Sequence, residues 1–389
     1  MAKFALHKSF KGFPLSKLST RLLIAPGLAL GGLFSLAAPV SSPKGSNCAD
    51  QSIVLGFSGD ILVHDALYKS ILDKQSFLPL WRQVVPLFQK ADFMVVNLEG
   101  PAAMGITKDF KDLGDVGFTY DQIVYSGTNF LFNFHPQILM DLKVSGVDLV
   151  SNANNHSLDR SSLGIDRTIE AAEALEVPLV GIKHSKAAAP LNYYVANVHG
   201  YNLAFLACTE MTNGFVDKKK QLLYCYQDAT KIENEIRELS TRKDIDGVIV
   251  MPHWGVEYAA KPDNQQRAFA QRFLRAGALA IVGSHPHVFQ PVEYVTLSDG
   301  RKAIVAFSMG NFLAYQKDLN RKTGAVIYLR LQRDARGRVQ LVNSYYTPTY
   351  RDAFEVLPAT KKLFQAARDH AALFFSQETL VEAAQKICD

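Results

Sequence analysis

In Ile53-Val54-Leu55-Gly56-Phe57-Ser58-Gly59-Asp60, an apolar run of strand length ends in a carboxylate. The same arrangement of a short apolar run followed by polar residues recurs at residues 93–97, 147–151, 248–251 and 280–282. These runs alternate with stretches of helical spacing, which is typical of an α/β protein. From residue 292 onward the pattern predicts mainly strands. We therefore expect an α/β fold with two packed mixed β-sheets flanked by helices.

The remaining pattern predicts where the other elements lie. A hairpin is expected at residues 193–198 and 202–207, and residues 104–134 have weak periodicity and are predicted to form a loop beside the site. The other expected helices are 64–72, 80–89, 136–144, 164–175, 229–241, 264–276, 359–370 and 378–387, and the later strands are 292–296, 303–308, 325–332 and 339–346.

The N-terminus has the layout of an export signal. Residues 1–37 hold five basic residues and no acid, and an apolar stretch from Leu22 to Val40 ends in small residues. The length of this stretch fits a cleaved signal peptide and a retained signal anchor equally well. We expect a linker at residues 38–51, a main domain at 52–315, and strands and helices at 316–389 that complete the same domain. The protein is thus predicted to be exported to the periplasm or another extracytoplasmic space, with an anchor left open.

Charge and cysteine content exclude several classes. Because the N-terminal segment holds the excess of positive charge, 37 basic residues face 37 acidic ones in the remainder, and composition gives no support for nucleic-acid binding. The four cysteines are Cys48, Cys208, Cys225 and Cys388, and none has the spacing of a metal site. A bridge between Cys208 and Cys225 and a pair of buried thiols are both open.

Metal-capable side chains follow the apolar runs, at the strand ends where α/β folds build their sites. Taken singly, each is more often a cap or a satisfied polar group, but together they would be costly to bury without a metal. Two carboxylates, an amide and three imidazoles suit one or two divalent ions, with Mn, Fe or Zn favoured over Mg or Ca. The candidates are Asp60, Glu99, Asn155, His253, His285 and His287.

Six ordered motifs make a family resemblance specific. They are GDIL at 59–62, NLEGP at 97–101, ANNHSLD at 153–159, PHWGVEY at 252–258, GSHPHV at 283–288 and SMGNF at 308–312. This series resembles the CapA/PgsA family of bacterial capsule and poly-γ-glutamate synthesis proteins, which is similar in turn to the calcineurin-like metallophosphoesterases. The resemblance implies a metallophosphoesterase-like sandwich.

The resemblance also implies roles for individual residues. Asp60 and His287 would bind a first metal, Glu99 would bridge, and Asn155, His253 and His285 would serve a second metal. His156 would be the general acid, oriented by Asp159. Substrate contacts are expected from Asn154, Trp254, Glu257 and Asn311, although Trp254 fits loop packing equally well and Asn311 also fits a turn cap.

One position departs from the wider superfamily, because Leu62 stands where a histidine normally follows the first aspartate. His64 is a substitute ligand or, more often at a helix start, a structural residue. A single-metal site therefore stays open. Arg160 and Arg167 are candidates for anion contacts, although a helix surface is the commoner position for such residues.

The function implied is that of an exported metal-dependent hydrolase. A metal-bound hydroxide would attack a phosphoester or γ-glutamyl amide bond during capsule or poly-γ-glutamate synthesis, export or processing. The expected partners are an anionic cell-envelope polymer or phosphoester substrate and a membrane-bound capsule synthase. The alternative is a non-catalytic accessory protein that binds an anionic polymer or a membrane synthase, because fold does not fix function.

Overall fold

The computed structural model describes residue 45, residue 48 and residues 50–128, 131–187 and 193–388. The expected export segment at 1–37 lies outside the described residues, as does the linker at 38–51 except for residues 45, 48, 50 and 51. Among the helices of the described residues, none is both long enough and apolar enough to cross a bilayer.

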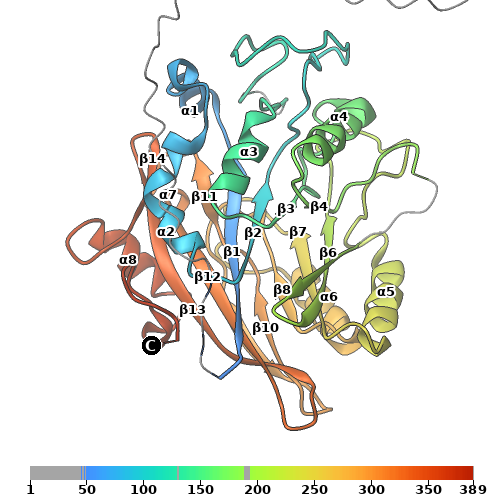
Figure 1. Ribbon diagram of the computed structural model, residues 1–389, viewed down its shortest axis with the longest axis vertical. Coiled ribbons are helices and arrows are strands. Elements are labelled where there is room, and N and C mark those ends of the chain that lie inside the picture. Colours follow the sequence, from blue (N-terminus) through green and yellow to red (C-terminus); the bar gives the residue numbers. More distant parts are fainter. Residues whose placement is uncertain (1–44, 46–47, 49, 129–130, 188–192, 389) are drawn as a thin grey trace, which may run out of the picture. The chain divides into compact units, whose positions relative to one another are not determined.

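The first sheet has eight strands and mixed direction (Figure 1). Its order is β14-β13-β12-β1-β2-β3-β4, and β11 also pairs with β1. β1 runs parallel to β2 and β11 and antiparallel to β12. The strands are β1 (Ile53–Leu62), β2 (Phe93–Leu98), β3 (Leu149–Ser151), β4 (Leu179–Val180), β11 (Asn311–Ala314), β12 (Thr323–Arg333), β13 (Val339–Asp352) and β14 (Glu355–Pro358).

The second sheet has six strands in the order β5-β6-β7-β8-β10-β9. Its central pairs β6·β7, β7·β8 and β8·β10 are parallel, and both edge pairs are antiparallel. The strands are β5 (Tyr193–Val198), β6 (Tyr201–Thr209), β7 (Gly247–His253), β8 (Ala280–Val282), β9 (Val292–Thr296) and β10 (Lys302–Ala306). The predicted architecture of two mixed sheets is confirmed.

Three apolar clusters hold the layers together. The inward faces of both sheets meet in one cluster, to which β1 contributes Leu55 and Phe57 and β6 contributes Phe205. Val54, on the other face of β1, packs in a second cluster with the first helices. Because β1 is buried on both faces, its sequence reads as a continuous apolar run.

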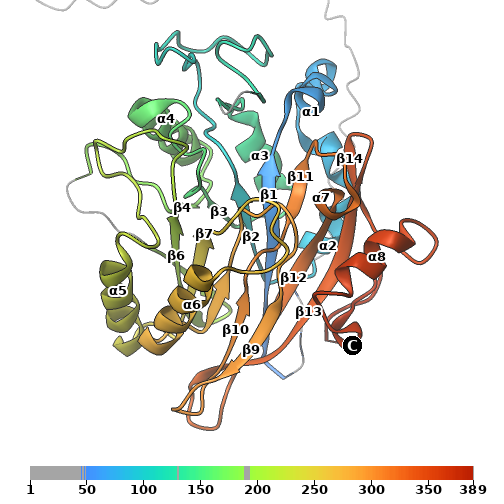
Figure 2. The same cartoon turned by 180° about the vertical axis from the view of Figure 1, so that it is seen from behind.

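Helices cover the outer faces of both sheets (Figures 1 and 2), whereas α8 packs with the cluster between the sheets. α1, α2 and α3 pack on the first sheet, and α5 and α6 form the third cluster with the second sheet. The helices are α1 (Asp65–Lys69), α2 (Val85–Phe88), α3 (Gln137–Val144), α4 (Ser161–Ala174), α5 (Ala229–Thr241), α6 (Asn264–Ala276), α7 (Leu319–Lys322) and α8 (Gln365–Ala371). Four short 3-10 helices complete the described elements: Leu72–Lys74, Leu78–Leu80, Arg82–Val84 and Gln377–Thr379.

Two predicted helices are wrong. The stretch 80–89 is divided among short 3-10 turns and the four-residue α2, because Pro79 and Pro86 lack the N–H groups that a longer helix needs. The stretch 378–387 is irregular after the 3-10 turn at Gln377–Thr379. Its backbone is engaged from outside instead: the Val381 N–H donates to the Tyr346 carbonyl, and the Thr347 hydroxyl donates to the Val381 carbonyl.

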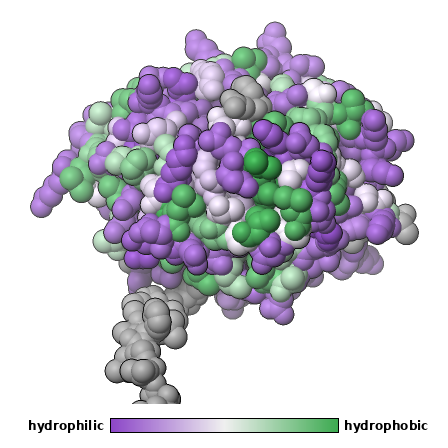
Figure 3. All heavy atoms as spheres, turned by 90° about the horizontal axis from the view of Figure 1, so that it is seen from above, coloured by the Kyte–Doolittle hydropathy of each residue, from purple (hydrophilic) through white to green (hydrophobic). Residues whose placement is uncertain are grey.

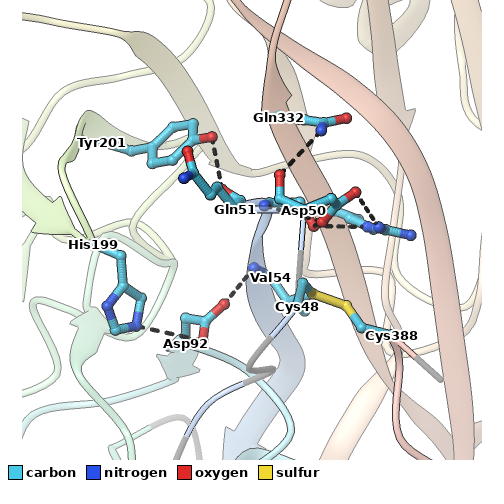
Figure 4. Close-up of a disulfide and its surroundings, with 11 residues drawn as sticks. Cys48, Asp50, Gln51, Val54, Asp92, His199, Tyr201, Gln332 and Cys388 are labelled. Carbon is cyan, nitrogen blue, oxygen red and sulfur yellow. Dashed lines mark hydrogen bonds and ion pairs between the residues drawn. A yellow bond between two sulfur atoms is a disulfide. The ribbon is translucent and has the colours of Figure 1, made fainter.

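Two disulfides join distant or looped segments of the described chain. Cys48 bonds Cys388 and so ties the start of the domain to its end (Figure 4). The same figure shows Asp92 accepting from the Val54 N–H at 2.7 Å beside the start of β1. Cys208 bonds Cys225, the pairing that the sequence had left open against buried thiols.

Figure 3 looks onto the face above the carboxyl end of β1. It is largely hydrophilic, with a group of hydrophobic residues near its middle. The loop at 104–128 exposes several apolar side chains, namely Phe110, Leu113, Val116 and Ile123. Its backbone is nevertheless held from inside, because the buried Asn133 amide donates to the carbonyls of Ala103, Ile106 and Val124.

Candidate metal centre

The carboxyl ends of strands from both sheets deliver the candidate ligands to one place. Asp60 lies within β1, Glu99 follows β2, and His253 ends β7. His285 and His287 follow β8. All five side chains are buried, and Asp60 and Glu99 are fully buried. The site therefore lies where the two sheets approach each other.

These residues form two ligand groups that share one carboxylate. Glu99, His253 and His285 make one group, and Asp60, Glu99 and His287 make the other, with ligand atoms within 4.8 Å of one another in each. Neither carboxylate oxygen of Glu99 has a hydrogen-bond partner in the described structure. The imidazoles of His253 and His287 are near, with their Nε2 atoms 3.4 and 3.7 Å from Glu99 Oε1. A fully buried carboxylate that accepts no hydrogen bond is costly. The donor set fits one or two divalent cations.

The two carboxylates have pKa values that their surroundings push apart. Burial raises the pKa of Glu99 to about 8. Burial would also raise the pKa of Asp60, but His287 and His253 outweigh it and lower that pKa below its usual value. For His287 burial opposes the charged ring, yet the carboxylates of Glu99 and Asp60 raise its pKa to about 10. The metal-free cluster therefore holds protons that a bound cation must displace.

Neighbouring polar groups orient the two candidate ligands Asp60 and His253. Asn97 Nδ2 donates to Asp60 Oδ1 at 2.8 Å. The Nδ1 atom of His253 lies 2.9 Å from the Ser284 hydroxyl, which directs Nε2 toward the cluster. Such outer contacts fix ring orientation and tautomer in metal sites.

An amide lies beside the group of candidate ligands that contains His253 and His285. Asn155 Oδ1 lies 2.9 Å from His253 Nε2, and that same Nε2 lies 3.1 Å from His285 Nδ1. Three potential ligand atoms thus converge at one point. Burial lowers the pKa of His253 to about 3, which keeps that ring neutral and able to ligate.

Strained backbone brings the two histidines of the GSHPHV motif to the cluster. His285 has a φ of 101° and His287 a φ of 59°, in a region that side-chain-bearing residues rarely adopt. The His285 N–H donates to Asp60 Oδ2 at 3.2 Å, which helps to hold the turn. Strain of this kind gathers at functional sites.

His156 and Asp159 form a buried pair beside the ligands. His156 Nδ1 lies 2.7 Å from Asp159 Oδ2, which also accepts from the Phe132 N–H. Burial opposes the charged form of His156, but Asp159 outweighs it and raises the His156 pKa. The Phe132 ring packs against His156 with centroids 4.7 Å apart, so the segment 104–134 does border the site.

The residues predicted to contact substrate lie in different surroundings. Trp254 is fully buried and donates to the Phe307 carbonyl, which places it in the core rather than over the candidate ligands. Asn154 is also fully buried, and its amide donates to the Leu98 carbonyl. Asn311 Oδ1 lies 2.9 Å from His287 Nδ1 and so orients a ligand. Glu257 is half-buried, and its charge acts on the cluster.

Other basic candidates have structural contacts. His64 accepts from the Tyr315 N–H and packs on Phe132, and it is outside both ligand groups. Arg160 is fully buried, and its guanidinium donates to carbonyls of the 104–134 segment and of Asp159, which differs from the helix-surface position expected. Arg167 pairs with Asp112 and Glu170 at the surface.

Sequence reasoning missed three residues that surround the ligands. Asn97 and Ser284 lie within the quoted motifs NLEGP and GSHPHV, so their closeness to Glu99 and His285 was a usable signal. Asn213 lies 3.4 Å from both Asn155 and His156. It belongs to no motif, and only the folded loop brings it there.

The fold and site define an α/β protein with a buried carboxylate–imidazole centre between two mixed sheets. Residues 54–316 match the family described as Bacterial capsule synthesis protein PGA_cap, and the chain belongs to that family. The chain is 27% identical over 330 residues to "PGA biosynthesis protein CapA" of Bacillus subtilis (strain 168), covering 85% of this chain and 79% of the relative. It is 25% identical over 286 residues to "Capsule biosynthesis protein CapA" of Bacillus anthracis, covering 73% and 65%.

Solved structures are more distantly similar. A hypothetical protein from Thermus thermophilus has a TM-score of 0.42 and 15% identity, covering 77% of this chain and 100% of that one. A putative 5'-nucleotidase from Staphylococcus aureus has a TM-score of 0.42 and 12% identity, covering 82% and 58%. Similarity at this level says nothing about the activity of this chain.

Proposed function

We propose that this protein is an exported metal-dependent hydrolase that acts on a phosphoester or amide bond of a cell-envelope substrate. The observation that carries the proposal is Glu99, a fully buried carboxylate without hydrogen-bond partners that is shared by two ligand groups. Membership of the capsule synthesis family supports a setting in the synthesis, export or processing of an anionic capsule polymer. Export is supported by the two disulfides, since such bonds persist mainly in oxidising compartments.

The ligand residues divide the work between two positions. Asp60 and His287 would hold one cation, His253, His285 and Asn155 would hold the other, and Glu99 would serve both. A cation held there supplies Lewis acidity and lowers the pKa of water. Imidazole and carboxylate donors favour Mn, Fe or Zn.

His156 is proposed to move the proton that the leaving group needs. Asp159 occupies Nδ1 of the imidazole, which leaves Nε2 as the ring atom that can exchange a proton with the substrate. Because Asp159 also raises the His156 pKa, it keeps more of the ring in the acid form. The pair would thus donate a proton to the departing oxygen or nitrogen.

The test is elemental analysis of the purified protein compared with its His253→Ala and His287→Ala variants. The expected result is bound Mn, Fe or Zn in the wild-type chain and a lower content in both variants. The two substitutions remove one imidazole from each ligand group. His156→Ala should keep the metal and lose hydrolysis of phosphodiester and γ-glutamyl substrates.

Wild-type protein without metal after both aerobic and anaerobic preparation would sink the hydrolase proposal. That outcome would favour an accessory protein that binds an anionic polymer or a membrane synthase. Unchanged hydrolysis in His156→Ala would contradict the role of His156 as general acid, while the proposed metal site would stand.

A further inference from the structure

The disulfide Cys208–Cys225 closes a loop, residues 208–225, at the carboxyl end of β6. Backbone hydrogen bonds fix both of its stems: the Thr209 N–H donates to the Leu223 carbonyl at 2.9 Å, and the Cys225 N–H donates to the Thr209 carbonyl at 2.8 Å. We call this segment the closed loop. The disulfide and these two backbone hydrogen bonds therefore fix the base of the closed loop together.

The closed loop contacts the strand end that carries His253. The Glu210 N–H donates to the His253 carbonyl at 2.8 Å. The Glu210 carboxylate then accepts from the Gly255 N–H at 2.7 Å. The first residues of the closed loop therefore lie beside the end of β7, the strand that carries the candidate ligand His253.

Three residues further along, Asn213 reaches the candidate ligand Asn155. Asn155 Nδ2 donates to Asn213 Oδ1 at 3.4 Å, which leaves Asn155 Oδ1 directed at His253 Nε2, 2.9 Å away. An amide can ligate a hard or borderline cation only through its oxygen. Asn213 thus selects the orientation in which Asn155 presents its ligand atom.

The same side chain also meets the His156 ring. Asn213 Nδ2 lies 3.4 Å from His156 Nδ1, on the ring edge that Asp159 occupies at 2.7 Å. Asn213 has a φ of 50°, a left-handed conformation that asparagine, aspartate and glycine adopt most readily. The left-handed backbone at this position therefore presents the Asn213 amide to Asn155.

We propose that Asn213 is a positioning residue, which orients the Asn155 amide from the disulfide-closed loop. This inference rests on the proposed function. Outer contacts to metal ligands commonly change metal affinity by 10–100-fold when they are removed. Asn213 touches no predicted substrate position, so its effect acts through Asn155.

The test compares Asn213→Gly and Asn213→Asp in the full chain, with Lys219→Ala as the matched control on the same loop. Glycine keeps the left-handed backbone and deletes the amide, and aspartate keeps an oxygen that accepts from Asn155 Nδ2. Lys219 is exposed. Affinity for Mn²⁺ and Zn²⁺ is measured by competition with a chelating dye, and kcat and KM with a chromogenic phosphodiester at saturating metal.

Asn213→Gly is expected to lower metal affinity by about 10-fold or more, while Asn213→Asp and Lys219→Ala stay near wild type. At saturating metal, kcat should fall in Asn213→Gly with little change in KM. Should Asn213→Gly not fold, Asn213→Ser decides the same question, because its hydroxyl does not reach Asn155.

Equal metal affinity in the glycine variant and the lysine control overturns the inference alone. Equal loss in Asn213→Gly and Asn213→Asp also overturns it, because the acceptor oxygen would then play no part. Wild-type protein that binds neither cation overturns the proposed function and this inference together.

Discussion

At the scale of single residues, His156 and Asp159 behave as one unit. Asp159 is fully buried, and its Oδ1 has no hydrogen-bond partner in the described structure, while Oδ2 contacts His156. A buried carboxylate next to an imidazole favours the charged ring. Removal of the Asp159 carboxylate should therefore change the protonation of His156 more than it changes the packing around the ring.

Asp159→Asn is predicted to lower kcat by about 10²–10⁴-fold, the usual size of a general acid–base contribution, with metal content unchanged. Because Asp159 raises the His156 pKa, the variant loses the acid form at lower pH. The basic limb of the kcat profile should therefore move to lower pH. Steady-state kinetics across pH on the variant and on Asp369→Asn, an exposed carboxylate of α8, would measure this. A basic limb at the wild-type position would contradict the assignment.

Glu99 makes a second prediction at this scale, because its proton must leave before a cation binds. Burial raises its pKa to about 8, and the His287 pKa is about 10 in the metal-free cluster. Binding should release protons, so metal affinity should rise with pH between about 6 and 8. Calorimetric titration in buffers of different ionisation enthalpy measures the release, and Glu99→Gln should reduce it. Equal affinity at both ends of that range would contradict the prediction, because neither Glu99 nor His287 would then release a proton on binding.

The site could be predicted from sequence as far as its motifs reach. Asp60, Glu99, His253, His285 and His287 follow apolar runs, and the carboxyl ends of strands in the two sheets bring these positions together. Asn213 could not be found in this way, because its loop returns to the site only after folding. The roles of the individual ligands stay predictions until metal is measured.

At the scale of elements, β1 and β11 approach each other closely beside Asp60. A Cβ added to Gly59 would lie 1.9 Å from the Gly310 carbonyl oxygen, and the Asp60 N–H donates to that same oxygen. The strand pairing shifts register between Asp60 and Ile61. A bulge of this kind re-aims a side chain, and here it lies at the Asp60 carboxylate.

Gly59→Ala is predicted to destabilise the protein by at least about 1–3 kcal/mol, the cost of forced overpacking, and to reduce metal content. The methyl group meets backbone, which cannot rotate away as a side chain can. Gly247→Ala is the matched control, since its nearest new contacts are leucine side chains at 3.2 Å or more. Denaturant unfolding and elemental analysis of both variants test this. Equal losses in the two would show that β1 tolerates the methyl group.

Sequence periodicity did not predict some of the short elements. β11 has four residues and starts at Asn311, which the sequence treated as a site residue after a strand. β14, also of four residues, pairs only with the end of β13. Strands this short have too few residues for a period to show. The predicted helix at 378–387 is wrong for another reason, because tertiary contacts to β13 and a disulfide at Cys388 hold this segment in an irregular conformation.

At the scale of the whole described domain, one disulfide lies far from the candidate metal centre and the other closes a loop that contacts it. Cys48–Cys388 joins segments 340 residues apart, near the start of β1. Asp60 lies seven residues beyond Ile53 on the same strand, roughly 23 Å away at 3.3 Å per residue. Cys208–Cys225 instead closes a loop that contacts candidate ligands directly.

The variant Cys48→Ser/Cys388→Ser is therefore predicted to lower the free energy of unfolding by about 2–5 kcal/mol, because the unfolded chain regains the freedom of a long loop. Its metal content and metal affinity should match wild type. Cys208→Ser/Cys225→Ser opens a far shorter loop, for which a loss of about 3 kcal/mol is expected, yet it should also weaken metal binding, because Asn213 is no longer held against Asn155. Denaturant unfolding with chelator competition on both double variants separates the two effects. The prediction is contradicted if metal binding weakens in the Cys48/Cys388 variant and is unchanged in the Cys208/Cys225 variant.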